Sequence, residues 1–458
     1  MKPKPVSVVS IAKYSQAKLD EINLASTDDP PTLSLAEAES LAVSNNLDQQ
    51  VARLKHDLAK RELGVSNYNM LPELVAKSSY YGRNVYSGTN NAPLQPSNKI
   101  GSRTNRATTS QDLHTVSSEL SIGWNILDFG LSYFRAKQVA DEVLIAQEMY
   151  QRGQETLKER VHETYWRAWS HQRYTKRIHK VRSRIEKALA TAERLENERA
   201  TSPLTSLTYQ REILNIEKSI SGIEAGSVTA KAELATLIGA RPGGQFLFAP
   251  QQQRDGQCSF ILPSEKMTNL ALRNRPEIRE AYYKERLSSL DVKIALLETL
   301  PNANLSASTN LDSNSFLFNQ NWLGWSSQVG WNLMKAFTYS RRKSVAVKKT
   351  EIAKAQGMAT VLAVVGQVHI ARAQYFHAKK ALKAAKRLQR VQKRILRQMK
   401  ASRTAGVADE NTVVREELNA ILADMELDTA TTYFWSACSK LRRSMGISTV
   451  GQLVSAME

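Results

Sequence analysis

The segment SSELSIGWNILDFG at residues 117–130 decides the fold, because it recurs in the same chain as WSSQVGWNLMKAF at residues 325–337. Both copies contain Gly-Trp-Asn. The glycine that ends the following helical region, Gly239 or Gly446, lies 115 residues after the tryptophan in each copy. Shared order at a shared spacing predicts that the chain is built from two copies of one structural unit.

Both segments alternate between apolar and polar or small residues, which is typical of a β-strand with one apolar face. A further alternating segment lies before each of them, after Pro72 in the first copy and after Pro301 in the second. The sequence therefore predicts a β-hairpin in each copy and four strands in all. The apolar positions that we assign to one face are Leu120, Ile122, Trp124, Leu305, Val329 and Trp331.

Long helices are expected on either side of the hairpins, because no proline occurs within 97–202 or 302–458 to interrupt them. A helix of nearly 70 residues follows each hairpin, and after a short turn a returning helix of about 36 residues ends at the glycine. A helix of similar length precedes each hairpin and ends at a proline. The expected helices are Ser34–Leu71 and Ser132–Ala200 in the first copy, and Ser264–Leu300 and Thr338–Thr404 in the second.

These elements predict a mainly α fold with a small β part and an internal two-fold repeat. The linker between the copies is rich in Gly, Gln and Pro, and we expect it to lie at mid-height of the helices. The expected organisation is an N-terminal extension at 1–32, repeat 1 at 33–239, an equatorial linker at 240–263, repeat 2 at 264–447 and a C-terminal tail at 448–458.

The chain is strongly basic, with 63 Lys and Arg against 44 Asp and Glu and a net charge of +19. Between Lys335 and Arg403 the only acid is Glu351. A stripe of cations follows a spacing of four and three residues on the second long helix, namely Lys379, Lys383, Lys386, Arg390, Lys393, Arg397 and Lys400. We expect an ion-paired face against acids of the returning helix; a cationic channel lining and a nucleic-acid surface are the alternatives.

No run approaches the roughly 18 apolar residues of a membrane-spanning helix, which excludes a polytopic helical transporter but not strands in a membrane. Residues 1–31 hold only a brief apolar patch, so we do not expect them to act as a signal peptide. Two cysteines allow at most one disulfide, and the seven histidines contain no HExxH motif. We expect no metal, cofactor or catalytic residue.

Four strands with one apolar face leave two open edges, whose backbone groups would be unsatisfied in lipid. Closure therefore needs strands from other chains, and three chains would supply twelve. The doubled unit resembles the TolC family of outer-membrane channel proteins over about residues 33–447. The resemblance rests on NLD…LP (46–72), RPE…LP (275–301), GWNILDFG (123–130) and AGVADENTVVREEL (405–418).

The resemblance implies a homotrimer with a 12-stranded β-barrel in the outer membrane and a long coiled-coil helical barrel that extends into the periplasm. It implies a passive channel and not an enzyme. The expected partners are outer-membrane lipid against the apolar strand face, a periplasmic adaptor and an inner-membrane transporter, in tripartite efflux or type I secretion.

The two turns between long and returning helices are the expected gate and adaptor contact. The residues concerned are Ala200, Thr201, Ser202 and Pro203 in the first turn, and Ala405, Gly406 and Asp409 in the second. We expect the chain to bend at Gly406 and Asp409 to act as the N-cap of its returning helix.

A rival interpretation is a soluble, basic coiled-coil protein that binds anionic partners such as nucleic acid. The composition is compatible with it. We do not favour nucleic-acid binding, because it gives the four alternating segments no role.

Overall fold

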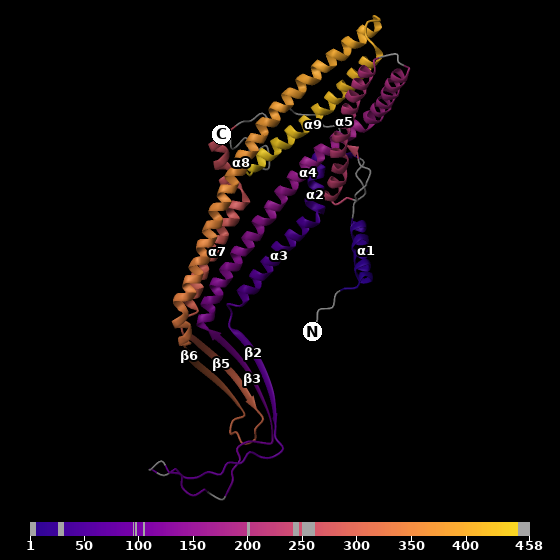
Figure 1. The fold of residues 1–458 in the computed structure, drawn as a ribbon. Helices are drawn as coiled ribbons and strands as arrows, with labels where there is room; N and C mark the ends of the chain where they lie inside the picture. Colours follow the sequence, from indigo (N-terminus) through magenta and orange to yellow (C-terminus); the bar gives the residue numbers. More distant parts are fainter. Residues whose placement is uncertain are drawn as a thin grey trace. The chain divides into compact units, whose positions relative to one another are not determined.

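The computed structural model contains fifteen named helices and strands within its described residues, which Figure 1 labels in chain order. Two compact units are present: a helical unit of Met1–His56, Ala146–Glu280 and Gly357–Glu458, and a strand unit of Asp57–Ile145 and Ala281–Gln356. The structure describes residues 6–25, 32–94, 96, 99–103, 106–198, 202–240, 247–249 and 262–447.

The internal repeat is seen most directly in four pairs of helices of equal length. Each pair occupies the same place in its copy, before or after the strands. The pairs are α2 (Leu35–Asn45) and α6 (Ser264–Asn274) at 11 residues, α3 (Leu47–Tyr68) and α7 (Pro276–Leu297) at 22, α4 (Ile126–Asn197) and α8 (Leu333–Thr404) at 72, and α5 (Pro203–Leu237) and α9 (Glu410–Ser444) at 35. The prediction of two related halves is confirmed.

The helix before each hairpin was predicted as one piece, and this is wrong. The helix is interrupted at Asn46, between α2 and α3, and at Arg275, between α6 and α7, where the backbone is extended. The Asn46 side chain accepts from the Gln49 amide at 3.2 Å, which satisfies a free donor at the start of α3. In the second copy the residue before Pro276 is driven out of the helical region by the proline ring.

The asparagine of each Gly-Trp-Asn segment ends a strand and starts a long helix. Asn125 accepts from the backbone amides of Leu127 and Asp128 at 3.0 and 3.1 Å. Asn332 accepts from the amide of Lys335 at 3.4 Å. Both long helices therefore begin several residues earlier than predicted. The alternating pattern favours a strand at these positions, but the asparagine side chain caps the backbone amides and starts a helix there.

The strand unit holds one antiparallel sheet in the order β2-β3-β5-β6, so the two hairpins are joined through β3 and β5. Figure 1 shows these four strands side by side. Between β2 and β3, isolated bridges pair Thr89 with Thr108 and Leu94 with Ile100. The strands are β2 (Glu73–Gly82), β3 (His114–Asn125), β5 (Asn302–Asp312) and β6 (Asn321–Gly330).

The helical unit has its largest core where α2, α4, α5, α6, α8 and α9 meet. Tyr165 of α4 is fully buried there, and its hydroxyl donates to the Leu33 carbonyl at 3.0 Å. Leu33 lies in β1 (Thr32–Leu33), which pairs in parallel with β4 (Leu247–Phe248). Trp166 stacks on Trp435 with ring centroids 6.3 Å apart. These aromatic residues of α4 therefore pack between helices.

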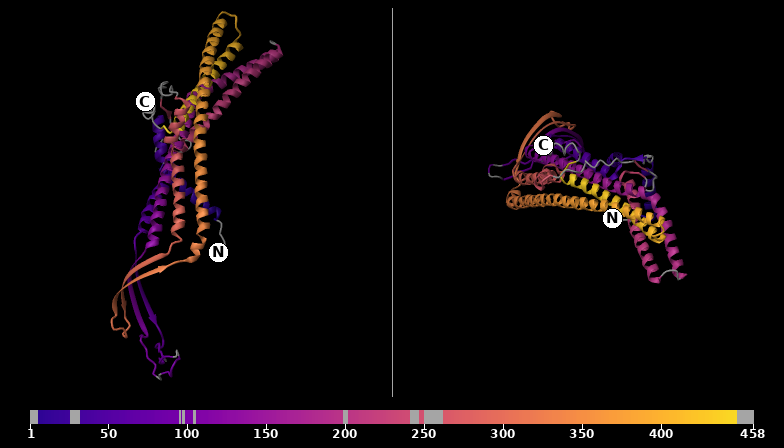
Figure 2. Two further views of the ribbon diagram at one scale, coloured as in Figure 1. Left: turned by 90° about the vertical axis from the view of Figure 1, so that its left-hand side faces the viewer. Right: turned by 90° about the horizontal axis from the view of Figure 1, so that it is seen from above.

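Two antiparallel helix pairs, α4 with α5 and α8 with α9, complete the helical unit (Figure 2). A second buried cluster joins α4, α5 and α9 through Ile185, Ile213 and Leu418 among others. The N-terminal helix α1 (Val8–Ala25) has Val8 and Val9 largely exposed. A membrane-crossing length of apolar helix is not found among the described residues.

Candidate functional site

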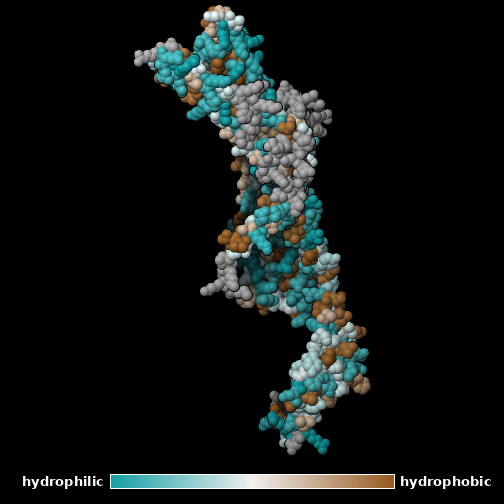
Figure 3. Space-filling view, turned by 90° about the vertical axis from the view of Figure 1, so that its right-hand side faces the viewer, coloured by the Kyte–Doolittle hydropathy of each residue, from teal (hydrophilic) through white to brown (hydrophobic). Residues whose placement is uncertain are grey.

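One face of the four-stranded sheet is apolar. Trp124 lies directly opposite Leu305, and residues paired in this way in an antiparallel sheet point to the same face. The pairing of β5 with β6 places Val329 on the same face. Alternation along β3 adds Leu120 and Ile122. These five side chains are between 41% and 71% exposed, so nothing in the described strand unit covers them. Figure 3 shows hydrophobic side chains at the surface of the strand region.

Trp331, the sixth residue assigned to this face, lies just beyond the end of β6. Its indole Nε1 donates to the Thr299 carbonyl at 3.0 Å, which ties the ring to the segment that follows α7. The ring itself is 56% exposed. Trp331 thus has a satisfied polar end and an exposed apolar body.

The opposite face of the sheet is polar and consists mainly of serine and asparagine. Hydroxyl pairs cross between strands on this face, with 2.7 Å between Ser79 and Ser117 and 2.8 Å between Ser306 and Ser326. The face includes Ser117, Ser121, Asn304, Ser306, Ser308, Asn310, Ser326 and Gln328. Polar side chains of this kind can be solvated by water, whereas the apolar side chains of the other face are stabilised by burial.

Both edges of the sheet are open in the described part of the chain. β2 pairs only with β3, and β6 pairs only with β5. Each edge strand is 10 residues long, so a continuous row of backbone donors and acceptors is available for a further strand. Such an edge, next to an exposed apolar face, is incomplete in a single chain.

The first turn at the end of the helical unit lies between α4 and α5. Pro203 is the first residue of α5, where a missing N–H costs nothing. Ser202 occupies the N-cap position, although its side chain makes no capping bond. The predicted residues Ala200 and Thr201 lie outside the described residues.

The second turn lies between α8 and α9. Ala405 and Gly406 form the bend, and Gly406 has a φ of +74°, which a residue with a side chain rarely adopts. Asp409 occupies the N-cap position of α9 with extended backbone, as expected. Its carboxylate makes no capping bond, which differs from the expectation for an N-cap aspartate.

The starts of α5 and α9 meet around a cavity of 420 Å³ that both Leu204 and Asp409 line. Arg415 of α9 pairs with Glu212 of α5 across it, with Nη1 and Oε2 3.1 Å apart. Burial, together with the negative charge of Asp409, raises the pKa of Tyr209 to about 12. Near the two turns, α5 and α9 are thus joined by this ion pair as well as by the buried apolar cluster that includes Ile213 and Leu418.

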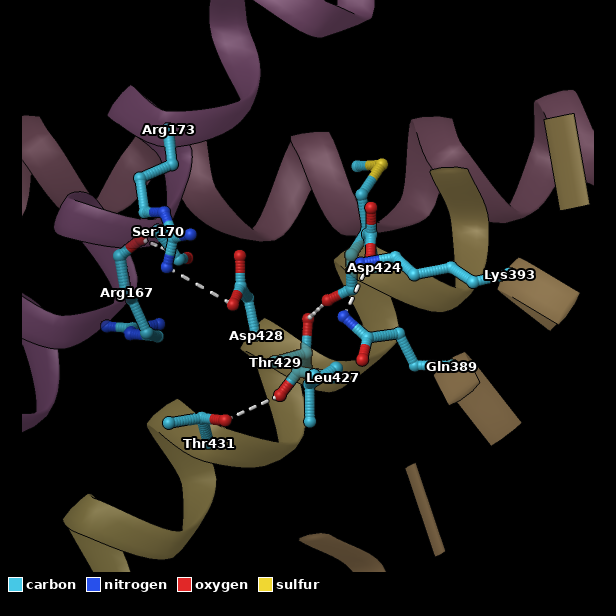
Figure 4. Close-up of polar contacts among 11 residues, drawn as sticks. Arg167, Ser170, Arg173, Gln389, Lys393, Asp424, Leu427, Asp428, Thr429 and Thr431 are labelled. Atoms are coloured by element: carbon cyan, nitrogen blue, oxygen red, sulfur yellow. Dashed lines mark hydrogen bonds and ion pairs between the residues drawn. The ribbon is translucent and has the colours of Figure 1, made fainter. Parts of the chain in front are cut away.

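The C-terminal part of α8 is attached to α9 through polar side chains. Figure 4 shows Gln389 and Lys393 reaching Asp424, at 2.7 and 3.0 Å. Lys400 pairs with Glu417 at 3.8 Å, and Arg403 pairs with Glu410. The predicted ion-paired face is therefore correct at two members of the cationic stripe.

The other five members of the stripe are exposed and have no acidic partner among the described residues. They are Lys379, Lys383, Lys386, Arg390 and Arg397. The predicted ion-paired face therefore does not extend to these five cations, because the acids of α9 lie on only one side of α8. Helical spacing could have revealed this, since the seven cations do not all share the side that carries Gln389.

Residues 267–446 match the sequence profile of a family described as outer membrane efflux protein. This part of the chain, most of the second repeat, is therefore similar to outer membrane efflux proteins. Members of this family are channels and not enzymes, in agreement with the expectation from the sequence. A comparison with curated protein sequences gives no match.

Solved structures share the fold of this chain over most of its length. A membrane protein from Pseudomonas aeruginosa has a TM-score of 0.70 at 17% identity and covers 90% of each chain. CusC, described in terms of transmembrane channel formation, has 0.69 at 16%, over 90% of this chain and 92% of its own. The open outer membrane channel MtrE of Neisseria gonorrhoeae has 0.65 at 16%, over 92% and 90%. At these identities the likeness shows a shared fold.

Proposed function

We propose that three copies of the chain form a passive channel in the outer membrane that extends into the periplasm. The observation that carries this proposal is the two-faced sheet with both edges open. Three copies would supply twelve strands and leave no edge, with the apolar face toward lipid and the serine-rich face toward water. Strands of 10 to 12 residues match the roughly 9–11 that a tilted strand needs to cross a bilayer.

The exposed seam of α3 supports association of copies. Its apolar residues occupy the four-and-three spacing of a coiled coil, with Arg61 at the one remaining position, and each is at least 49% exposed; they are Leu47, Val51, Leu54, Leu58, Val65 and Tyr68. The described residues offer no partner for this seam. A neighbouring copy in a trimer would cover it and remove the apolar surface from water.

Trp331 supports an interfacial position for the end of β6. An aromatic ring that is exposed at its apolar body and hydrogen-bonded at its polar end suits the boundary between lipid and water. Leu120, Ile122, Trp124, Leu305 and Val329 would then lie against the hydrocarbon.

The turns at Ser202-Pro203 and at Ala405, Gly406 and Asp409 are proposed to form the gate and to contact a periplasmic adaptor. The Arg415–Glu212 pair near the turns is partly exposed, and an ion pair of this kind separates at low cost. Export would be driven by an inner-membrane transporter that the adaptor connects to the channel, in tripartite efflux or in type I secretion.

Fractionation and oligomeric state test the proposal. Produced with an export leader, the protein should sediment with outer membranes, resist carbonate extraction and have the mass of a trimer by light scattering in mild detergent. In planar bilayers it should conduct ions without added energy. A monomer that stays in the aqueous fraction would overturn the proposal and favour the soluble basic coiled coil.

A further inference from the structure

Eight exposed cations lie close together on α8. They are Lys379, Lys380, Lys383, Lys386, Arg387, Arg390, Arg394 and Arg397. None of the eight has an acidic partner among the described residues, in contrast to Lys393 and Lys400 on the same helix. We call this set the cationic face.

The cationic face occupies one side of the helix only. Each residue turns an α-helix by about 100°, and the contacts of Gln389, Gln392 and Lys393 mark the direction of α9. Relative to Gln389, the eight cations lie between about 60° and about 180° around the axis. Leu388 and Val391, both about half exposed, lie on the remaining side together with Ile395.

This arrangement separates three surfaces on one helix: the α9 side, an apolar side and the cationic face. In a closed ring of helices each helix has two neighbours, which divide its circumference into a narrower and a wider part. The narrower part faces the lumen and the wider part faces outward, because the ring curves. With α9 as one neighbour and a helix against Leu388 as the other, the wider arc contains the cationic face. This step rests on the proposed channel, and it puts the face outside the ring and not in the lumen.

Like charges three or four residues apart destabilise a helix, and the cationic face contains several such pairs. An anionic ligand that follows the same spacing would relieve the repulsion. From Lys379 to Arg397 the face extends about 27 Å along the axis, at 1.5 Å per residue. Another helix with carboxylates every three and four residues has the matching repeat, and the arginines of the second half suit carboxylates because they can bind both oxygens.

We propose that the cationic face is a docking surface for an acidic α-helix of a partner protein, lying along the outside of the helical ring. The partner needs about five turns of helix with aspartate or glutamate on one side. Charge complementarity favours this occupant, because the face carries no apolar residue that would call for a hydrophobic partner.

Peptide binding to the intact protein in detergent tests the charge match. The probe is a fluorescent alanine-rich helix of about four heptads with glutamate at the first and fourth positions of each. The variant K383E/K386E/R390E/R394E should bind at least about tenfold more weakly than the wild type, and a peptide with lysine at the same positions should bind the variant better. The milder variant Arg390→Gln should have an intermediate affinity.

The matched control reverses four exposed cations elsewhere on the helical unit, in the variant R211E/K218E/K266E/R273E. This control should keep wild-type affinity for the glutamate peptide. Equal losses in both variants would mean that only net charge matters and would overturn the proposal. Binding of duplex DNA or of phosphatidylglycerol vesicles through these cations, without peptide binding, would overturn it as well.

Ion selectivity in planar bilayers distinguishes an outer surface from a channel lining. Reversal of the cationic face should leave the reversal potential in a salt gradient unchanged, since charges outside the ring do not line the conduction path. A shift toward cation selectivity would place the face in the lumen and overturn the proposal. Absence of any conductance in the wild type would instead refute the channel, while the peptide assay would still test the face.

Discussion

Gly446 lies so close to Asn274 that a Cβ added to the glycine would be 2.7 Å from the asparagine Cβ. Gly239 has the same relationship with Asn45, also at 2.7 Å. In both copies the second residue after a returning helix packs on the last residue of a short helix. The glycines have φ values of +71° and +72°, so both space and backbone conformation require glycine.

Replacement of Gly446 by alanine is therefore expected to destabilise the helical unit by about 2–4 kcal/mol. About 1–2 kcal/mol comes from the left-handed backbone, and the remainder comes from overpacking against Asn274. Gly406→Ala is the matched control, because Gly406 has a φ of +74° but no atom near an added Cβ. Thermal unfolding followed by circular dichroism should show a clearly larger fall in Tm for Gly446→Ala; equal falls would contradict the packing argument.

Arginine on the apolar face of the sheet should be costly if that face meets lipid. Leu120→Arg, Ile122→Arg or Val329→Arg is expected to cost about 2–4 kcal/mol near the bilayer midplane. Ser121→Arg and Gln328→Arg on the polar face should be tolerated. Denaturant titration of protein refolded into lipid vesicles measures the difference, and similar costs on both faces would show that neither face is buried in lipid.

The Arg415–Glu212 pair is expected to hold the two turns together. Because both side chains are partly exposed, Arg415→Ala should shift a closed-to-open equilibrium by no more than about 1 kcal/mol, or roughly fivefold. The readout is the open fraction of single channels in planar bilayers. The exchanged pair R415E/E212R should restore the wild-type open fraction, and failure of that rescue together with an unchanged Arg415→Ala would exclude this pair from gating.

His162 should make the helical unit sensitive to acid. Burial, together with the positive charges of Arg443 and Arg442, lowers the pKa of its imidazole to about 3. Below pH 6.5 the unfolded chain binds a proton that the folded state does not, so stability falls as the pH decreases from about 6.5 toward about 3. By pH 5 the loss is about 2 kcal/mol.

A His162→Gln variant checks this assignment. The substitution removes the titrating group, so the variant should lose less stability than the wild type between pH 7 and pH 5, whatever its stability at pH 7. The exposed His369 provides the control His369→Gln, which should keep the wild-type dependence. An identical pH profile in wild type and His162→Gln would assign the acid sensitivity to other groups.

Several features of the fold follow from local sequence alone. Alternation around Trp124 and Val329 predicts strands and their faces, since successive side chains of a strand point to opposite sides. Proline-free stretches predict the two long helices. The equal spacing from Trp124 to Gly239 and from Trp331 to Gly446 predicts the internal repeat, because two copies of the same structural unit need the same number of residues.

Other features depend on residues that are distant in sequence. The breaks at Asn46 and Arg275 interrupt patterns that otherwise read as continuous helix. At Asn46 the side chain also donates to the Leu237 carbonyl, a contact that no local pattern contains. The pairing of β3 with β5, which makes one sheet of the two hairpins, is likewise a choice between partners far apart in the chain.

The charge pattern shows the same division most clearly. The spacing of Lys379, Lys393 and the other cations places a stripe on a helix, and sequence establishes that much. Which of them meet acids depends on where α9 lies along α8, so Lys393 reaches Asp424 while Lys379 has no acidic partner among the described residues. Periodicity determines where side chains lie around one helix. The position of a second helix is set by packing over the whole interface, so only the tertiary structure shows that position.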